Sequence, residues 1–204
     1  MKRNLEIAIE TFPIAGKFTI SRGSRTEAAV VTATIREGYH MGRGECVPYR
    51  RYGESVEGVA EAIEGARKLI EEGHGREALQ EALPAGAARN ALDCALWDLE
   101  AKISGVPAHV TAGIDRIPPV ATAYTISLDT PEAMHEAVRK ASGRPILKIK
   151  LGAPEGDVER IRAVRDAAPE AVLLADANEG WPPGDVQRYI DACAEAGFSL
   201  VEQP

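Results

Sequence analysis

Strand-like patterning fills the first part of the chain, from Leu5 to about Cys46. Within it, residues 29–35 form an apolar run rich in β-branched side chains, which favour strands. Gly38 and the Gly-Arg-Gly segment at 42–44 bound this run. The pattern therefore predicts that the chain opens with strands.

Helical spacing follows these strands. Apolar positions between 56 and 70 recur on one face of a predicted helix, and Ser55 is a suitable N-cap for it. A second helix is predicted over 92–103, and it stops at Gly105. Strands followed by helices indicate an α+β domain, which we assign to residues 1–115.

From residue 116 onward, the pattern alternates between strands and helices. Apolar runs predict strands at 120–126, 146–150, 172–175 and 198–201. A helix is expected to begin at Thr130-Pro131, because proline suits the first helical position. The run 172–175 is apolar throughout, as expected for a strand buried on both faces of a parallel sheet. Residues 116–204 are therefore predicted to form βα units with about four strands, which makes the chain an α/β protein.

Polar side chains recur at the ends of these predicted strands. Lys150, Asp176 and Glu202 follow one another at a spacing of 26 residues. This spacing is near the roughly 30 residues per βα unit of a (β/α) barrel, where active sites lie at the carboxyl ends of the strands. We therefore expect these side chains to meet at one edge of the sheet.

The segment Lys148-Ile149-Lys150 places two lysines on one face of a strand, because side chains two residues apart point the same way. Ile149 is then expected to be buried behind them. Two neighbouring ammonium groups lower each other's pKa, and burial lowers it further. A lysine of this kind can act as a general base, and an exposed pair on an edge strand is the competing interpretation.

Asp176 and Glu202 end neighbouring predicted strands, so their carboxylates are expected to point toward a common centre. Hard oxygen ligands of this kind suit Mg²⁺. Taken alone, Asp176 could instead cap a helix, and Glu202 could be a surface carboxylate. The recurrence of charged residues at three successive strand ends favours a metal site.

Composition and charge exclude several other classes of function. The chain is 45% hydrophobic and 27% charged, as in ordinary globular proteins, and its net charge of −7 argues against a nucleic-acid partner. It has neither an apolar run of about 18 residues nor an apolar stretch after its basic start, so we expect no membrane span and no secretion signal. Three widely spaced cysteines suggest free thiols in a cytoplasmic protein.

The strand-end motifs resemble those of a known family. Lys148-Ile149-Lys150, Asp176-Ala177-Asn178 and Glu202-Gln203-Pro204 resemble the KxK, DAN and EQP motifs of the muconate-lactonizing group in the enolase superfamily. Earlier segments resemble the L-Ala-D/L-Glu dipeptide epimerases: Ser21-Arg22-Gly23-Ser24-Arg25, Gly44-Glu45-Cys46, Arg51-Tyr52-Gly53-Glu54, and residues 84–93.

This resemblance implies an enolase-like α+β capping domain followed by the first half of a modified (β/α) TIM-type barrel. It implies an Mg²⁺-dependent isomerase that epimerises dipeptides such as L-Ala-D/L-Glu by α-proton abstraction through a metal-stabilised enediolate, in cell-wall peptide recycling. Lys150 would be one acid/base and Lys148 its electrostatic partner, while Asp176 and Glu202 would be two of three metal ligands.

The resemblance also assigns two substrate-binding residues. Arg25 lies with Arg22 and Gly23 in a predicted loop, and its position matches one that contacts the distal carboxylate of a Glu side chain. An acidic protein needs a local cation of this kind to hold an acidic substrate. Thr125, near the end of the first predicted barrel strand, is the second candidate for contact with a small dipeptide.

The third metal ligand and the opposing lysine are expected to lie after Pro204. We therefore expect the 204-residue chain alone to be inactive, and to need a C-terminal half or a second chain, with a homo-oligomer as a further option. Within the family, N-acylamino acid racemase, o-succinylbenzoate synthase and cycloisomerase stay open as alternatives. A non-catalytic partial barrel is the alternative from another class.

Overall fold

The computed structural model describes residues 2–204, which divide into two compact units. The first contains the chain up to Pro13 together with Glu27–Pro118, and the second contains Ile14–Thr26 together with Pro119–Pro204. The second unit thus includes the tip of a hairpin that starts near the N-terminus. The predicted domain limit between residues 115 and 116 stays a prediction.

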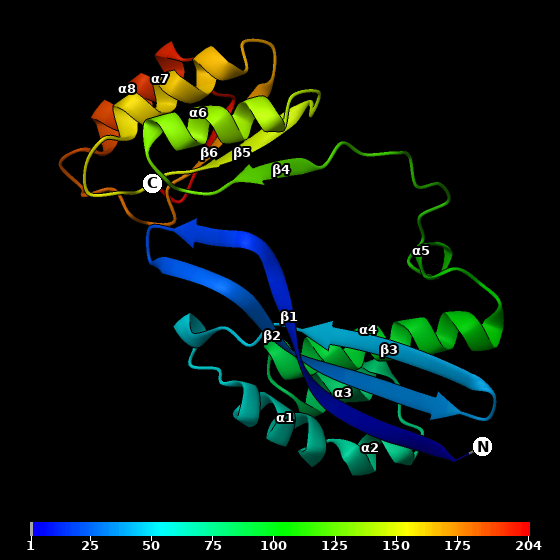
Figure 1. Cartoon of the computed structure of the whole chain (residues 1–204). Helices are drawn as coiled ribbons and strands as arrows, with labels where there is room; N and C mark the ends of the chain where they lie inside the picture. Colours follow the sequence, from blue (N-terminus) through cyan, green and yellow to red (C-terminus); the bar gives the residue numbers. More distant parts are fainter. Residues whose placement is uncertain (1) are drawn as a thin grey trace. The chain divides into compact units, whose positions relative to one another are not determined.

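The first unit combines an antiparallel sheet with helices, in the order predicted from the sequence (Figure 1). Its sheet has the strand order β1-β2-β3. The strands are β1 (Arg3–Ile20), β2 (Gly23–Glu37) and β3 (His40–Cys46), and the parts of β1 and β2 within residues 14–26 belong to the second unit. The helical segments are η1 (Arg50–Tyr52), α1 (Val56–Gly65), α2 (Arg67–Glu71), α3 (Arg76–Ala82), α4 (Ala87–Ser104) and α5 (Ala108–Thr111).

Two predictions for this unit are corrected by the structure. The single helix expected over 56–70 is broken at Ala66 into α1 and α2, next to Gly65, and glycine is a poor helix former. Residues 42–44 do not bound a strand but lie within β3. Ser55 caps α1 as predicted, since its side chain accepts a hydrogen bond from the backbone N–H of Gly58 at 3.0 Å.

The glycines of β3 allow α4 to lie directly on the sheet. A Cβ atom on Gly42 would be 2.1 Å from the carbonyl oxygen of Ala95, and one on Gly44 would be 2.0 Å from that of Ala91. No side chain fits at such distances, so the close approach of helix and strand depends on glycine at both positions. The buried face of α4, which includes Leu92, Leu96 and Leu99, completes the core there.

The second unit is a four-stranded parallel sheet with the strand order β4-β5-β6-β7. Helices α6–α8 lie along one face of this sheet (Figure 1). The strands are β4 (Ala123–Ile126), β5 (Ile146–Lys150), β6 (Val172–Asp176) and β7 (Leu200–Glu202). The helices are α6 (Pro131–Lys140), α7 (Asp157–Ala167) and α8 (Val186–Glu195). This βα alternation is the predicted one, and Thr130 with Pro131 begins α6 as expected.

The two faces of the parallel sheet differ in burial. Alternate residues such as Ile149 and Ala175 are fully buried in the core shared with the helices. On the other face Val172 is 43% exposed within the described chain, so the expectation that β6 is buried on both faces is wrong for residues 2–204. None of the helices formed by residues 2–204 is both long and apolar enough to cross a membrane.

Candidate active site

Three charged residues lie side by side at the carboxyl edge of the parallel sheet. Lys150 is paired with Asp176 between β5 and β6, and Asp176 is paired with Glu202 between β6 and β7. Residues spaced 26 apart in the sequence are therefore direct neighbours on adjacent strands of the sheet. Lys148 and Lys150 share a face, with Ile149 fully buried behind them, as predicted.

Lys148 connects the two carboxylates. Its Nζ donates to Oε2 of Glu202 at 2.6 Å and lies 2.9 Å from Oδ2 of Asp176. Burial disfavours the charged form of Lys148, but the hydrogen bonds to Glu202 and Asp176 outweigh this effect and raise its pKa above the ordinary 10.5. The prediction that Lys148 has a lowered pKa is therefore wrong for this arrangement, because each ammonium group is bonded to carboxylate oxygens.

Lys150 is the more deeply buried of the two lysines, with 7% of its surface exposed. Its Nζ donates to Oδ2 of Asp176 at 2.5 Å and to the side-chain oxygen of Asn178 at 3.1 Å. Nζ of Lys150 also lies over the Phe18 ring, 5.9 Å from the ring centre. Lys150 is thus held in a fixed position among polar and aromatic groups.

Asp176 is almost completely buried and is held as a carboxylate. Burial would favour its neutral form, but hydrogen bonds from Lys150, Lys148 and the backbone N–H of Asn178 outweigh burial and lower its pKa. A carboxylate that stays charged in a buried position is suited to bind a cation.

Asp176 and Glu202 fit a magnesium site in part. Both carboxylates reach one nitrogen atom, Nζ of Lys148, so both can also reach one small cation at this edge. Their oxygen atoms are the ligands that Mg²⁺ prefers. Among residues 2–204 no group of three or more His, Cys, Asp or Glu side chains could hold a metal ion, so these two would supply only part of its coordination.

The two predicted substrate-binding residues both belong to this unit. Thr125 is paired with Lys148 between β4 and β5, so it lies beside the lysine pair on the sheet. Arg25 lies on β2 and not in a loop as predicted, because the turn is short and β2 begins at Gly23. Arg25 is exposed.

The hairpin tip, residues 14–26, packs on the loops that follow the parallel strands. The backbone N–H of Leu128 donates to the carbonyl of Thr19 at 3.1 Å, next to the end of β4. After β6, the carbonyl of Asn178 accepts hydrogen bonds from the Ser21 hydroxyl, at 3.2 Å, and from the Arg22 guanidinium. The tip thus lies at the same edge of the sheet as Lys150.

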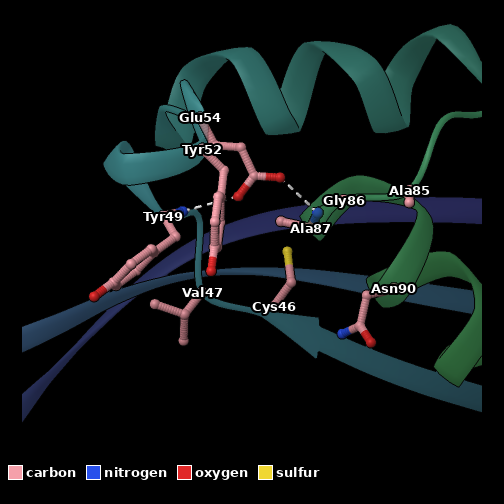
Figure 2. Close-up of a pocket in the computed structure, with 9 residues that line it drawn as sticks. All are labelled: Cys46, Val47, Tyr49, Tyr52, Glu54, Ala85, Gly86, Ala87 and Asn90. Carbon is pink, nitrogen blue, oxygen red and sulfur yellow. Dashed lines mark hydrogen bonds between the residues drawn. The ribbon is translucent and has the colours of Figure 1, made fainter. Parts of the chain in front are cut away.

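A separate pocket of about 580 Å³ lies in the first unit (Figure 2). The Glu54 carboxylate joins two of its walls, since it accepts hydrogen bonds from the backbone N–H groups of Tyr49, at 2.9 Å, and Ala87, at 2.7 Å. The pocket is lined by Cys46, Val47, Tyr49, Tyr52, Glu54, Ala85, Gly86, Ala87 and Asn90. Three of the epimerase-like sequence segments therefore meet here, and Glu54 fixes the loop before α1 to the start of α4.

Sequence reasoning missed the importance of Asn178 and of Ser21. In the sequence Asn178 stands only as the last residue of a motif, yet it contacts both Lys150 and the hairpin tip. The available signal was the position of Asn178, two residues after a strand-end aspartate. Ser21 begins a segment that resembles the dipeptide epimerases, but its contact joins residues 157 positions apart in the chain, and no local pattern specifies that contact.

Comparison with known families agrees with this fold. Residues 2–111 match the family described as mandelate racemase / muconate lactonizing enzyme, N-terminal domain, and residues 132–204 match the enolase C-terminal domain-like family. The chain therefore belongs to the mandelate racemase and muconate lactonizing enzyme family of the enolase superfamily.

Several relatives are similar along nearly the whole chain. The chain is 41% identical over 204 residues to the L-Ala-D/L-Glu epimerase of Escherichia coli strain K12. This match covers 99% of this chain and 63% of that protein. An Agrobacterium tumefaciens enolase family member with homology to dipeptide epimerases has a TM-score of 0.96 and 51% identity, covering 99% of this chain and 62% of that one. Its structure contains sodium and L-Ala-L-Glu.

A magnesium complex is found in a more distant relative. The dipeptide epimerase from Enterococcus faecalis V583, solved with Mg and L-Leu-L-Tyr, has a TM-score of 0.89 and 29% identity, covering 100% of this chain and 61% of that one. The present chain spans about three fifths of the length of these relatives.

Proposed function

We propose that the protein carrying this chain is an Mg²⁺-dependent epimerase of dipeptides such as L-Ala-D/L-Glu, and that this chain supplies one side of its reaction centre. The observation that carries the proposal is the alignment of Lys150, Asp176 and Glu202 on adjacent strands, with Lys150 buried beside Asp176. The similarity to named epimerases supports the choice of reaction.

Lys150 would take the α-proton from one face of the substrate α-carbon and, in the reverse reaction, deliver a proton to that face, while a second carrier on the opposite face completes the inversion. Contacts with Asp176 and Asn178 fix its Nζ, so the proton transfer needs little rearrangement of the protein. Lys148 would add a positive charge close to where the substrate carboxylate gains negative charge. Asp176 and Glu202 would hold Mg²⁺, which when bound stabilises that negative charge.

Arg25 would select an acidic second residue in the dipeptide. It is exposed on the hairpin tip, which packs at the same sheet edge as Lys150. A guanidinium there can form a charge-assisted hydrogen bond with a Glu side chain, which the overall charge of −7 would otherwise repel. Thr125, beside Lys148, would contact the same substrate.

The proposal is tested by following L-Ala-L-Glu and L-Ala-D-Glu by chiral chromatography after addition of the purified protein and Mg²⁺. We expect each diastereomer to give a mixture of both, loss of activity on removal of divalent cations with EDTA, and recovery when Mg²⁺ is restored. N-acetyl amino acids tested in parallel address the racemase alternative. Conversion of those compounds without conversion of any dipeptide, or full activity after chelation, would overturn the proposal.

A further inference from the structure

Asn178 connects groups that are far apart in the sequence. Its side-chain oxygen accepts a hydrogen bond from Lys150 Nζ at 3.1 Å, and its side-chain nitrogen donates to Gln203 at 3.3 Å. Its backbone carbonyl accepts the hydrogen bonds of Ser21 and Arg22 from the hairpin tip. One buried residue therefore contacts both the candidate base and the tip.

The backbone of Asn178 has a conformation that few residues adopt. Its φ is 50°, in the left-handed region, and Glu179 follows with a φ of 62°. Asparagine tolerates this region better than other residues with a side chain, apart from aspartate. This backbone is also held by the hydrogen bond from the Asn178 N–H to Asp176 at 3.0 Å, which directs the Asn178 carbonyl and side chain at the same time.

The hairpin tip is seated closely on the same loops. A Cβ on Gly152 would lie 2.9 Å from Cβ of Ser21, and one on Gly180 would lie 2.8 Å from it. The loops after β5 and β6 are themselves joined by Asp157, whose Oδ2 accepts hydrogen bonds from the Gly152 N–H and the Trp181 indole, both at 2.7 Å. Ser21 thus packs closely against Gly152 and Gly180, and its hydroxyl donates to the Asn178 carbonyl.

We infer that Asn178 is a positioning residue that couples the seating of the hairpin tip to the placement of the Lys150 ammonium group. The contacts of Ser21 and Arg22 fix the Asn178 carbonyl, and the same residue then presents its side-chain oxygen to Lys150. This inference rests on the proposed function, because it assigns Lys150 to proton transfer on one face of the substrate.

The coupling predicts different effects on the two substrate diastereomers. Only the substrate diastereomer that gives its α-proton to Lys150 depends on this hydrogen bond. Loss of the Asn178 side chain should therefore slow α-proton exchange from that diastereomer and spare exchange from the other. A residue needed only for folding or metal retention would slow both diastereomers together.

The test uses Asn178→Gly, which keeps the left-handed backbone and the carbonyl that binds the tip but removes the acceptor for Lys150. Exchange of the α-proton is followed in D₂O by ¹H NMR, starting separately from L-Ala-L-Glu and L-Ala-D-Glu. Circular dichroism and the melting temperature check that each variant is folded.

For Asn178→Gly we expect kcat for exchange to fall about tenfold or more for one diastereomer, with a small change in KM, because a hydrogen bond to a charged group is lost. The affected diastereomer should be the one whose exchange Lys150→Ala abolishes. Equal losses for both diastereomers in Asn178→Gly would overturn the inference.

Ser21→Ala tests the coupling itself. It removes the hydroxyl that binds the Asn178 carbonyl and keeps the Cβ that packs against Gly152 and Gly180. A fewfold loss is expected for the same diastereomer, and no further loss when the change is made in Asn178→Gly. Independent, additive losses would contradict the coupling. If the unaltered protein exchanges the α-proton of neither diastereomer, the proposed function fails. If the unaltered protein exchanges both, and Asn178→Gly also exchanges both at the unaltered rate, only this inference fails.

Discussion

At the scale of single residues, carboxylates from the next two strands of the sheet raise the pKa of Lys148. Strand periodicity alone placed Lys148 and Lys150 on one face. The raised pKa of Lys148 depends on Glu202, which lies two strands away, and on the length of the hydrogen bond between them. Such contacts across a sheet are fixed by tertiary packing, and no local pattern in the sequence specifies them.

Arg25 is predicted to set substrate choice without taking part in the chemistry. Replacement by alanine should reduce kcat/KM for L-Ala-L-Glu about ten- to a hundredfold more than for an Ala dipeptide with an apolar second residue, because one charge-assisted contact of about 1.5–3 kcal/mol is lost. Steady-state kinetics with both substrates measure this difference.

The matched control for Arg25 is Arg36→Ala. Arg36 lies on the same strand, is half exposed, and among residues 2–204 makes an ion pair with Glu6 alone, at 3.1 Å. Its loss should leave the ratio between the two substrates unchanged, because exposed ion pairs contribute little. Equal losses for both substrates in Arg25→Ala would remove Arg25 from substrate recognition.

At the scale of elements, the prediction succeeded where one local signal decides the structure. β5, predicted over residues 146–150, has those bounds, and the cap at Ser55 and the start of α6 at Pro131 are also as expected. The prediction failed at residues 42–44. From the sequence alone the glycines there indicate the end of a strand, but these residues lie inside β3. The reason is the approach of α4, a contact between segments about fifty residues apart, which requires glycine inside the strand.

Substitution of Gly44 by alanine should therefore destabilise the first unit. The added Cβ would overlap the carbonyl of Ala91, and overpacking of this kind costs about 1–3 kcal/mol or more, because helix and strand must separate. Thermal or urea unfolding measures the change.

Gly65→Ala is the control for this prediction. Gly65 ends α1 with open space around its Cα, so alanine should be neutral or stabilising by up to about 1 kcal/mol. If Gly44→Ala were as stable as Gly65→Ala, the close contact between β3 and α4 would be wrong.

At the scale of the whole chain, alternating strand and helix signals were sufficient to predict a parallel sheet, and the spacing of Lys150, Asp176 and Glu202 predicted its register. The resemblance to the dipeptide epimerases implied, through Arg25, that the hairpin tip lies near the substrate, but residue patterns alone could not place the tip on this unit. Its contacts bring residues 14–26 onto loops more than a hundred positions away, and they depend on single hydroxyl and carbonyl groups such as those of Ser21 and Asn178.

The central claim is that Lys150 carries a proton to and from one face of the substrate α-carbon. It is tested most directly by comparing the unaltered protein with Lys150→Ala in D₂O with Mg²⁺, starting from each Ala-Glu diastereomer and following the α-proton by ¹H NMR. We predict that the unaltered protein exchanges both diastereomers, and that the variant loses exchange from one by about a hundredfold or more, since a general base contributes about 10²–10⁴ in rate. Exchange of both diastereomers by folded Lys150→Ala at the unaltered rate would contradict the claim.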